Sequence, residues 1–167
     1  LEEVLKPDMP GQYFALRGGS LGSGGPASIG IAKETGKRVI AVVGDGAFNY
    51  TPQWIATARE QGVDVVEIVL KNDSYAFLDV AMAAERQRRG MNEEQLPNPQ
   101  SFQLETARPT ANKKLPVDIN YVDIATGYGG RGLRVTSREQ IPELIDFVLN
   151  TEGPGLVQLD IAKPAGE

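Results

Sequence analysis

The 167-residue chain contains neither cysteine nor histidine. Without cysteine, disulfides and thiolate metal sites are excluded. Without histidine, the chain cannot supply a histidine zinc site, a Ser-His-Asp triad or an imidazole general base. A metal ion bound by this chain is therefore expected to have oxygen ligands, which favours magnesium or calcium.

Long apolar runs and an excess of positive charge are also lacking. No run approaches the roughly 20 apolar residues that cross a bilayer. The chain opens with Leu1-Glu2-Glu3 rather than with a basic and then apolar leader. We therefore expect no membrane partner, a cytoplasmic location and a start inside a larger protein. Lys and Arg number 17 against 22 Asp and Glu, a net charge of −5, which argues against nucleic acid as a partner.

Short apolar runs alternate with amphipathic segments, as in an α/β domain. Hydrophobic residues make up 41% of the chain, and its length suits one globular domain, residues 1–167. Strands are expected at 12–16, 38–43, 64–70, 132–135 and 155–161. Helices are expected at 26–33, 52–61, part of 76–89, 119–127 and 137–150. This order predicts a three-layer sandwich, with a mostly parallel sheet and helices on both faces.

Two local patterns complete the predicted organisation. Ser137 and Gln140 have the spacing of a capping box at the start of the last helix. Residues 90–116 hold four prolines and show no clear period. Because a compact domain rarely carries so long an irregular stretch without a use for it, we interpret it as a lid or a mobile crossover.

Polar residues follow two consecutive predicted strands. The first strand runs into Gly44-Asp45-Gly46 and the second into Lys71-Asn72-Asp73-Ser74. Either segment alone is most often a simple turn. If the two strands are neighbours, however, Asp45 and Asn72 emerge side by side and offer the oxygen ligands that magnesium prefers. Magnesium keeps positions open for phosphate oxygens, so the pair predicts a phosphorylated cofactor. The amides of Ala47 and Phe48 could accept its anionic part.

At this spacing the sequence resembles a known signature. Gly44-Asp45-Gly46, with Asn72 placed 27 positions after Asp45, resembles the motif of thiamine diphosphate enzymes. Further segments, which together with the motif cover most of the chain, are similar to the benzoylformate decarboxylase and acetolactate synthase group: Gly18 to Gly22, Pro26 to Gly30, Val39 to Val43 and Asn72 to Tyr75. The chain thus resembles the C-terminal, diphosphate-binding domain of a 2-oxo acid decarboxylase.

The resemblance implies a role for each matching residue. Magnesium would be bound by the side chains of Asp45 and Asn72 and by the Ser74 carbonyl. The Gly19 carbonyl would accept a hydrogen bond from the 4′-amino group of thiamine diphosphate, and Leu21 would hold the cofactor bent so that this amine approaches the reactive carbon. The implied cofactor-binding residues are Gly19, Ser20, Leu21, Gly44, Gly46, Ala47, Phe48, Asn72, Ser74 and Tyr75.

Two positions depart from the family pattern. Ala47 stands where relatives often carry serine, so a hydroxyl that could bind the diphosphate is missing. Asp73 stands where many relatives have asparagine or glycine. Its carboxylate either faces solvent, or strengthens cation binding while repelling the diphosphate.

The other candidate sites are weaker. The glycine-rich run 18–25 could be a nucleotide loop, but it lacks Gly-Lys-Ser/Thr and the Gly-x-Gly-x-x-Gly spacing. The Glu85-Arg86-Gln87-Arg88-Arg89 cluster could contact phosphate, although a solvated helix face is the better interpretation. Trp54 is expected in the core.

The resemblance also implies that half of an active site is absent. In the family, a pyrimidine-binding domain or subunit supplies the glutamate that activates the cofactor, so no residue of this chain is expected to be catalytic by itself. The expected activity is cleavage or formation of a carbon–carbon bond of a 2-oxo acid by a dimer or tetramer. The chain could be a fragment, the smaller subunit of a split enzyme, or a binding module without catalysis.

Overall fold

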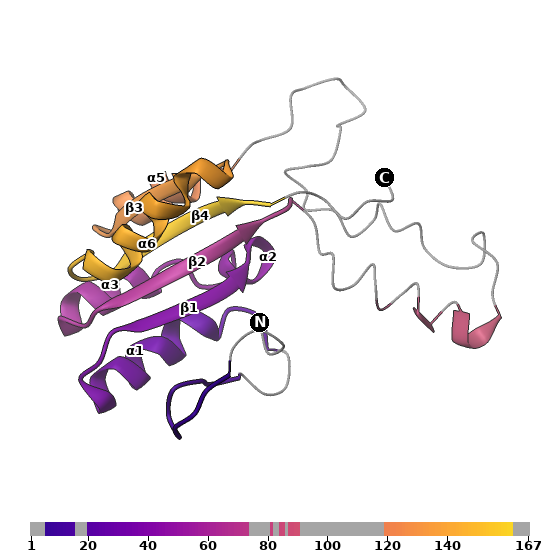
Figure 1. Ribbon diagram of the computed structural model, residues 1–167, viewed down its shortest axis with the longest axis horizontal. Helices are drawn as coiled ribbons and strands as arrows, with labels where there is room; N and C mark the ends of the chain where they lie inside the picture. The colour runs from indigo at the N-terminus through magenta and orange to yellow at the C-terminus, as the bar shows by residue number, and fades with distance from the viewer. Residues whose placement is uncertain are drawn as a thin grey trace.

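A computed structural model describes residues 6–15, 20–73, 81, 84–85, 87–90 and 119–161. Its described part contains a parallel sheet in the order β1-β2-β4-β3 (Figure 1). The strands are β1 (Val39–Gly44), β2 (Val65–Lys71), β3 (Arg131–Val135) and β4 (Gly155–Asp160). Each begins and ends within one residue of the predicted bounds, so the parallel α/β prediction is confirmed.

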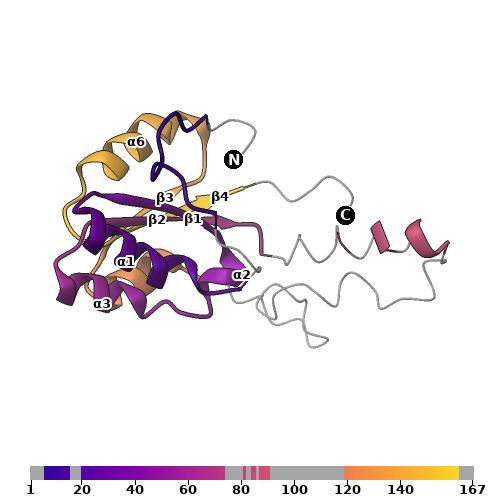
Figure 2. The same ribbon diagram turned by 90° about the horizontal axis from the view of Figure 1, so that it is seen from below.

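Helices cover both faces of the sheet, as the sequence predicts. On one face lie α1 (Gly24–Thr35), α3 (Trp54–Gln61) and α5 (Tyr121–Gly127), and on the other lies α6 (Ile141–Asn150) (Figure 2). Two short turns of helix complete the described elements, α2 (Asp45–Phe48) and the 3₁₀ turn η4 (Arg138–Gln140). Helix α2 was not predicted from the sequence, because Gly44-Asp45-Gly46 has the composition of a loop.

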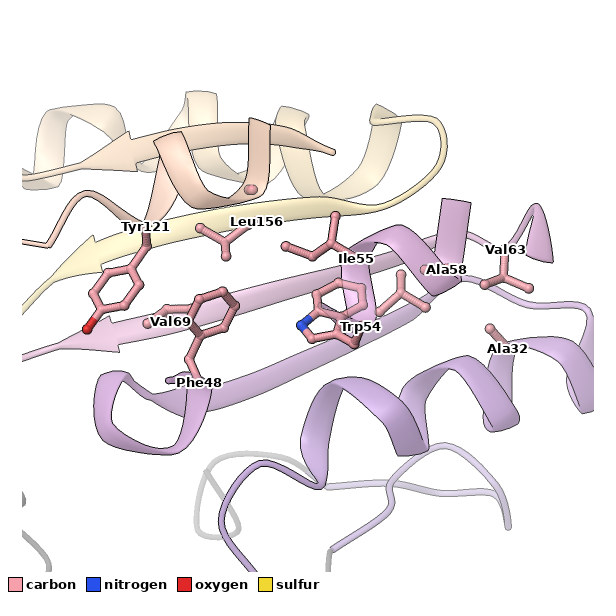
Figure 3. Packing of buried hydrophobic residues seen from close by; sticks show 11 residues of the cluster. Ala32, Phe48, Trp54, Ile55, Ala58, Val63, Val69, Tyr121 and Leu156 are labelled. Carbon is pink, nitrogen blue, oxygen red and sulfur yellow. The ribbon is translucent and has the colours of Figure 1, made fainter. Parts of the chain in front are cut away.

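The core is divided by the sheet into two clusters. Val65 and Val69 of β2 pack with the helices of the α1 side, whereas Val66 packs on the α6 side. The larger cluster joins α1, α3 and α5 to the sheet (Figure 3). A strand with apolar side chains toward both clusters is buried on both faces, which explains why β2 reads as a nearly continuous apolar run.

The predicted strand at 12–16 is wrong for residues 12–15, which are not paired with the sheet. Instead the side-chain oxygen of Gln12 accepts hydrogen bonds from the backbone N–H of Asp8, at 3.0 Å, and of Met9, at 3.4 Å. Gly11 has a φ of 83° in this turn. The local hydrogen bonds hold the segment in a turn, and Leu16 lies outside the described residues.

The capping box at Ser137 is also wrong in detail. The Ser137 side chain makes no capping hydrogen bond, and the Gln140 side chain accepts from the backbone N–H of Thr136 at 2.9 Å. The glutamine therefore reaches back one residue further than the capping box requires. It does so because the predicted helix begins with the separate turn η4 before α6.

Within 76–89, the described residues 81, 84–85 and 87–89 are helical, in agreement with the prediction. Glu85 forms ion pairs there with Arg88, at 2.8 Å, and with Arg89. These exposed pairs fit the interpretation as a solvated face. The predicted lid lies outside the described residues except for Gly90. Among the helices that the structure describes, none has the length and apolar character to span a bilayer.

Candidate cofactor site

Strands β1 and β2 end at the same edge of the sheet, where they bring Asp45 next to Asn72. The two strands pair in parallel, with Gly44 opposite Leu70. Asp45 Oδ2 accepts hydrogen bonds from the backbone N–H of Asn72, at 3.0 Å, and of Asp73, at 2.6 Å. The two polar segments, far apart in the sequence, thus meet at the carboxyl ends of neighbouring strands, where ligands bind in such sheets.

Asp45 is a buried carboxylate held by backbone amides. It begins α2, after Gly44 in an extended conformation, and only 2% of the residue is exposed. Its second oxygen, Oδ1, accepts the Gly46 N–H at 2.7 Å. Burial raises the pKa of Asp45, and its three backbone hydrogen bonds act in the opposite direction. The charged form is therefore held in place but lacks full compensation, a situation that a bound cation relieves.

The donor set at this edge fits magnesium. Asp45 makes no ion pair within the described residues, and Oδ1 accepts only one hydrogen bond there, which leaves a lone pair for a metal. The described residues contain no cluster of three or more carboxylates. Among the described residues, a cation here would thus meet a single carboxylate, with Asn72 at the end of the neighbouring strand. Such a set leaves positions for phosphate oxygens, as magnesium requires.

Asp73 is paired with Lys71. Lys71 Nζ donates to both carboxylate oxygens of Asp73, at 2.7 and 2.9 Å. Lys71 is 7% exposed, and Asp73 follows β2 in a left-handed conformation, with a φ of 55°. The Asp73 side chain is 33% exposed, so it faces solvent in part, and its effect on cation binding stays a prediction.

The glycine-rich turn lies against the chain that follows α2. Thr51 Oγ1 donates a hydrogen bond to the Gly22 carbonyl. Gly22 has a φ of 82°, and a Cβ atom there would lie 2.6 Å from Cβ of Tyr50, so this position requires glycine. Leu21, the preceding residue, is 49% exposed. The turn thus presents an apolar side chain at the surface close to the segment that begins with Asp45.

The family described as "Thiamine pyrophosphate enzyme, C-terminal TPP binding domain" matches residues 2–159. The chain belongs to this family. The resemblance drawn from Gly44-Asp45-Gly46 and Asn72 is confirmed, and this thiamine pyrophosphate (TPP)-binding domain has the fold that the family implies.

Relatives of this TPP-binding domain include decarboxylases. It is 30% identical to indole-3-pyruvate decarboxylase of Azospirillum brasilense over 86% of this chain and 21% of the relative. It is 28% identical to benzoylformate decarboxylase of Pseudomonas aeruginosa over 90% of this chain and 25% of the relative. A solved 4-hydroxybenzoylformate decarboxylase of Rhodococcus jostii RHA1 superposes with a TM-score of 0.62 and 25% identity, over 87% of this chain and 24% of that one. The chain spans about a quarter of the length of these relatives.

The side chain and the backbone of Phe48 lie in different surroundings. The Phe48 ring is buried and meets Tyr121 edge to face, with centroids 5.3 Å apart (Figure 3). Only the backbone of Phe48 is therefore available to a cofactor, whereas Ala47 beside it is half-buried. Three predicted site residues lie outside the described residues: Gly19, Ser74 and Tyr75.

One polar pair near this site was missed by the sequence analysis. Trp54 is in the core, as predicted, at 3% exposed. Its indole Nε1 also donates a hydrogen bond to Glu67 Oε2 at 2.6 Å. Glu67 is 2% exposed and sits in the middle of β2. The available signal was a single charged residue at the centre of the apolar run 65–70.

Proposed function

We propose that this domain binds magnesium and thiamine diphosphate and forms half of the active site of a 2-oxo acid decarboxylase or carboligase. One observation carries the proposal: the buried Asp45 carboxylate lies at the end of β1 and is hydrogen-bonded to the backbone of Asn72 at the end of β2. The family membership supports the cofactor, and the decarboxylases among the relatives support the reaction class.

Each residue at the site has a distinct task in this proposal. Asp45, Asn72 and the Ser74 carbonyl hold magnesium, and the amides of Ala47 and Phe48 hold the diphosphate. Leu21 props the cofactor from the side of the glycine-rich turn, while the Gly19 carbonyl orients its amino group. When bound, thiamine diphosphate supplies the electron sink for breaking or forming a carbon–carbon bond beside a carbonyl. The chain itself binds and orients.

The other half of the site comes from elsewhere in the protein or from a second subunit. We propose a pyrimidine-binding domain that supplies the activating glutamate, in an enzyme that assembles as a dimer or tetramer. The share of the relatives that the chain spans, about a quarter, supports this division. The second candidate is a binding module without catalysis. It predicts cofactor binding but no carbon dioxide release once the glutamate-bearing domain is added.

The Leu21→Ala substitution tests the catalytic part of the proposal. In the enzyme formed by this chain with its pyrimidine-binding domain, we expect kcat for carbon dioxide release to fall about 10- to 100-fold, because misplacing a reacting group by about 1 Å costs that much. The dissociation constant for thiamine diphosphate should change less than about threefold, since magnesium and the diphosphate carry the affinity. Turnover and cofactor titration measure the two effects.

Leu149→Ala is the matched control. Leu149 is 59% exposed on α6, on the opposite face of the sheet from α1 and α2. This variant loses the same atoms and should keep both turnover and cofactor affinity. An unchanged kcat in Leu21→Ala would show that Leu21 does not hold the cofactor in its bent form. An equal loss of kcat in both variants would show that the effect is not specific to Leu21.

A further inference from the structure

Glu67 is a buried carboxyl with a single hydrogen-bond partner in the part of the chain that the structure describes. Its side chain points from β2 toward the cluster on the α1 side, between Ala41 of β1 and Leu156 of β4 in the sheet register. Trp54 Nε1 is its one hydrogen-bond donor among the described residues. The other oxygen, Oε1, would lie 3.3 Å from a Cβ atom placed on Gly24. The carboxyl thus lies directly beneath the first turn of α1.

The first turn of α1 is shaped to fit this pair. Gly25 leaves room for the indole of Trp54, because a Cβ atom there would lie 2.6 Å from Nε1. Ser23, just before the helix, donates from Oγ to the Ser20 carbonyl at 2.7 Å. Through this bond the start of α1 is continuous with the turn that carries Ser20 and Leu21. The first turn of α1 therefore connects Glu67 to the glycine-rich turn.

The described residues around Glu67 offer it no compensating charge. Burial raises its pKa to about 7, and the hydrogen bond from Trp54 opposes that rise. The six residues of β1, Val39–Gly44, carry no charged side chain. The charged side chains of β2 and of the other elements packed around Glu67 face solvent or have other partners: Lys33 and Glu34 of α1, Arg59 and Glu60 of α3, Asp45 of α2, Lys71 of β2, Asp123 of α5, and Asp160 of β4.

We propose that Glu67 and Trp54 form a proton-dependent latch that seats the first turn of α1 against β2. With Glu67 neutral, the latch is closed and the start of α1 is held down. With Glu67 ionised, an uncompensated charge lies in the apolar cluster, and the first turn of α1 is loosened together with the glycine-rich turn. The effect on cofactor binding rests on the proposed function, whereas the latch itself is testable without cofactor.

The sign of the pH dependence follows from proton binding. Glu67 takes up its proton more readily in the folded chain than in the unfolded chain, where its pKa is 4.5. The stabilisation is therefore complete below pH 4.5 and is lost as the pH rises through about 7. Each pH unit between the two values changes the unfolding equilibrium constant about tenfold. The total is up to about 300-fold.

Trp54 is the single tryptophan of the chain and reports on the latch directly. In the folded chain without cofactor, tryptophan fluorescence should show a transition centred near pH 7. In urea unfolding, the equilibrium constant for unfolding of the wild type should rise with pH relative to that of Glu67→Gln. The rise should reach up to about 300-fold between pH 4.5 and 7, and the ratio should then stay constant. Glu67→Gln should lack the fluorescence transition.

Glu60→Gln, which neutralises an exposed glutamate of α3, is the matched control and should keep the transition. A wild-type chain without a fluorescence transition between pH 5.5 and 8.5 overturns the proposal, and this arm needs no variant to fold. A transition that persists in Glu67→Gln overturns it as well. Failure of cofactor binding alone, with the transition intact, contradicts the proposed function and leaves the latch standing.

Discussion

Asp45→Asn is expected to weaken magnesium-dependent binding of thiamine diphosphate by about 100-fold or more. The substitution removes the one carboxylate that the site offers to the metal and leaves the cation without that counter-charge. Removing one partner of a buried charged pair costs about 3–5 kcal/mol, and 1.4 kcal/mol is a factor of ten in affinity. Calorimetric titration of the variant with cofactor and magnesium measures the loss.

Asparagine is chosen because the Asp45 side chain also supports the backbone. It accepts three amide hydrogen bonds, from Gly46, Asn72 and Asp73. Alanine would leave these donors without an acceptor, at about 1–3 kcal/mol each if they stay buried. Asp45→Ala would thus lose stability as well as the metal. Asparagine keeps one acceptor oxygen for these donors. Circular dichroism of the Asp45→Asn variant checks that it is folded before the titration.

Asp73→Asn is the control for Asp45→Asn. It removes a carboxylate of the same neighbourhood, but one that is paired with Lys71. We expect its cofactor affinity to stay within about fivefold of the wild type, which is about 1 kcal/mol, because asparagine keeps an oxygen that can accept a hydrogen bond from the buried Lys71. Wild-type affinity in Asp45→Asn contradicts the metal assignment. An equal loss in both variants indicates that the local negative charge matters and not Asp45 itself.

Gly25→Ala is expected to destabilise the chain by about 2–3 kcal/mol. The added methyl group would lie 2.6 Å from Trp54 Nε1 and closer still to carbon atoms of the same ring. Trp54 is buried and hydrogen-bonded to Glu67, so the ring has little freedom to move away. Either α1 shifts or the indole leaves Glu67. Urea denaturation gives the change in the free energy of unfolding.

Gly30→Ala in the same helix should have the opposite sign. A Cβ atom at Gly30 meets nothing within 4 Å, and the residue is exposed. Alanine is favoured over glycine inside a helix by about 1 kcal/mol, so this variant should be more stable than the wild type by up to that amount. Equal effects of the two substitutions would show that helix propensity, and not the fit against Trp54, sets the stability of α1.

The strands and the two polar segments of the site, around Asp45 and around Asn72, could be predicted because their signals are local. A parallel strand that is buried on both faces has a continuous apolar sequence, as β1 and β2 do. Polar residues just after such a run mark the edge of the sheet at which the strands end. Asp45 and Asn72 needed only the assumption that β1 and β2 are neighbours, which the structure confirms. Bounds within one residue follow from the same runs.

The remaining features depend on contacts between distant segments. The sequence does not show that Lys71 neutralises Asp73, or that the Asp45 carboxylate caps the backbone at the end of β2. The hydrogen bond between Trp54 and Glu67 joins α3 to β2 and needs the space left by Gly25. Segment 12–15 failed as a strand because a side-chain hydrogen bond of Gln12 favours a turn over pairing with the sheet.

Titration calorimetry of the purified chain with thiamine diphosphate, in the presence and absence of magnesium, tests the central claim most directly. We expect saturable binding at one site per chain that requires magnesium. The same titration is repeated with a glutamate-bearing pyrimidine-binding domain added, in case the site closes only at the interface between the two. Binding that does not depend on magnesium, or no binding in either titration, would contradict the assignment of Asp45 and Asn72 as the centre of a cofactor site.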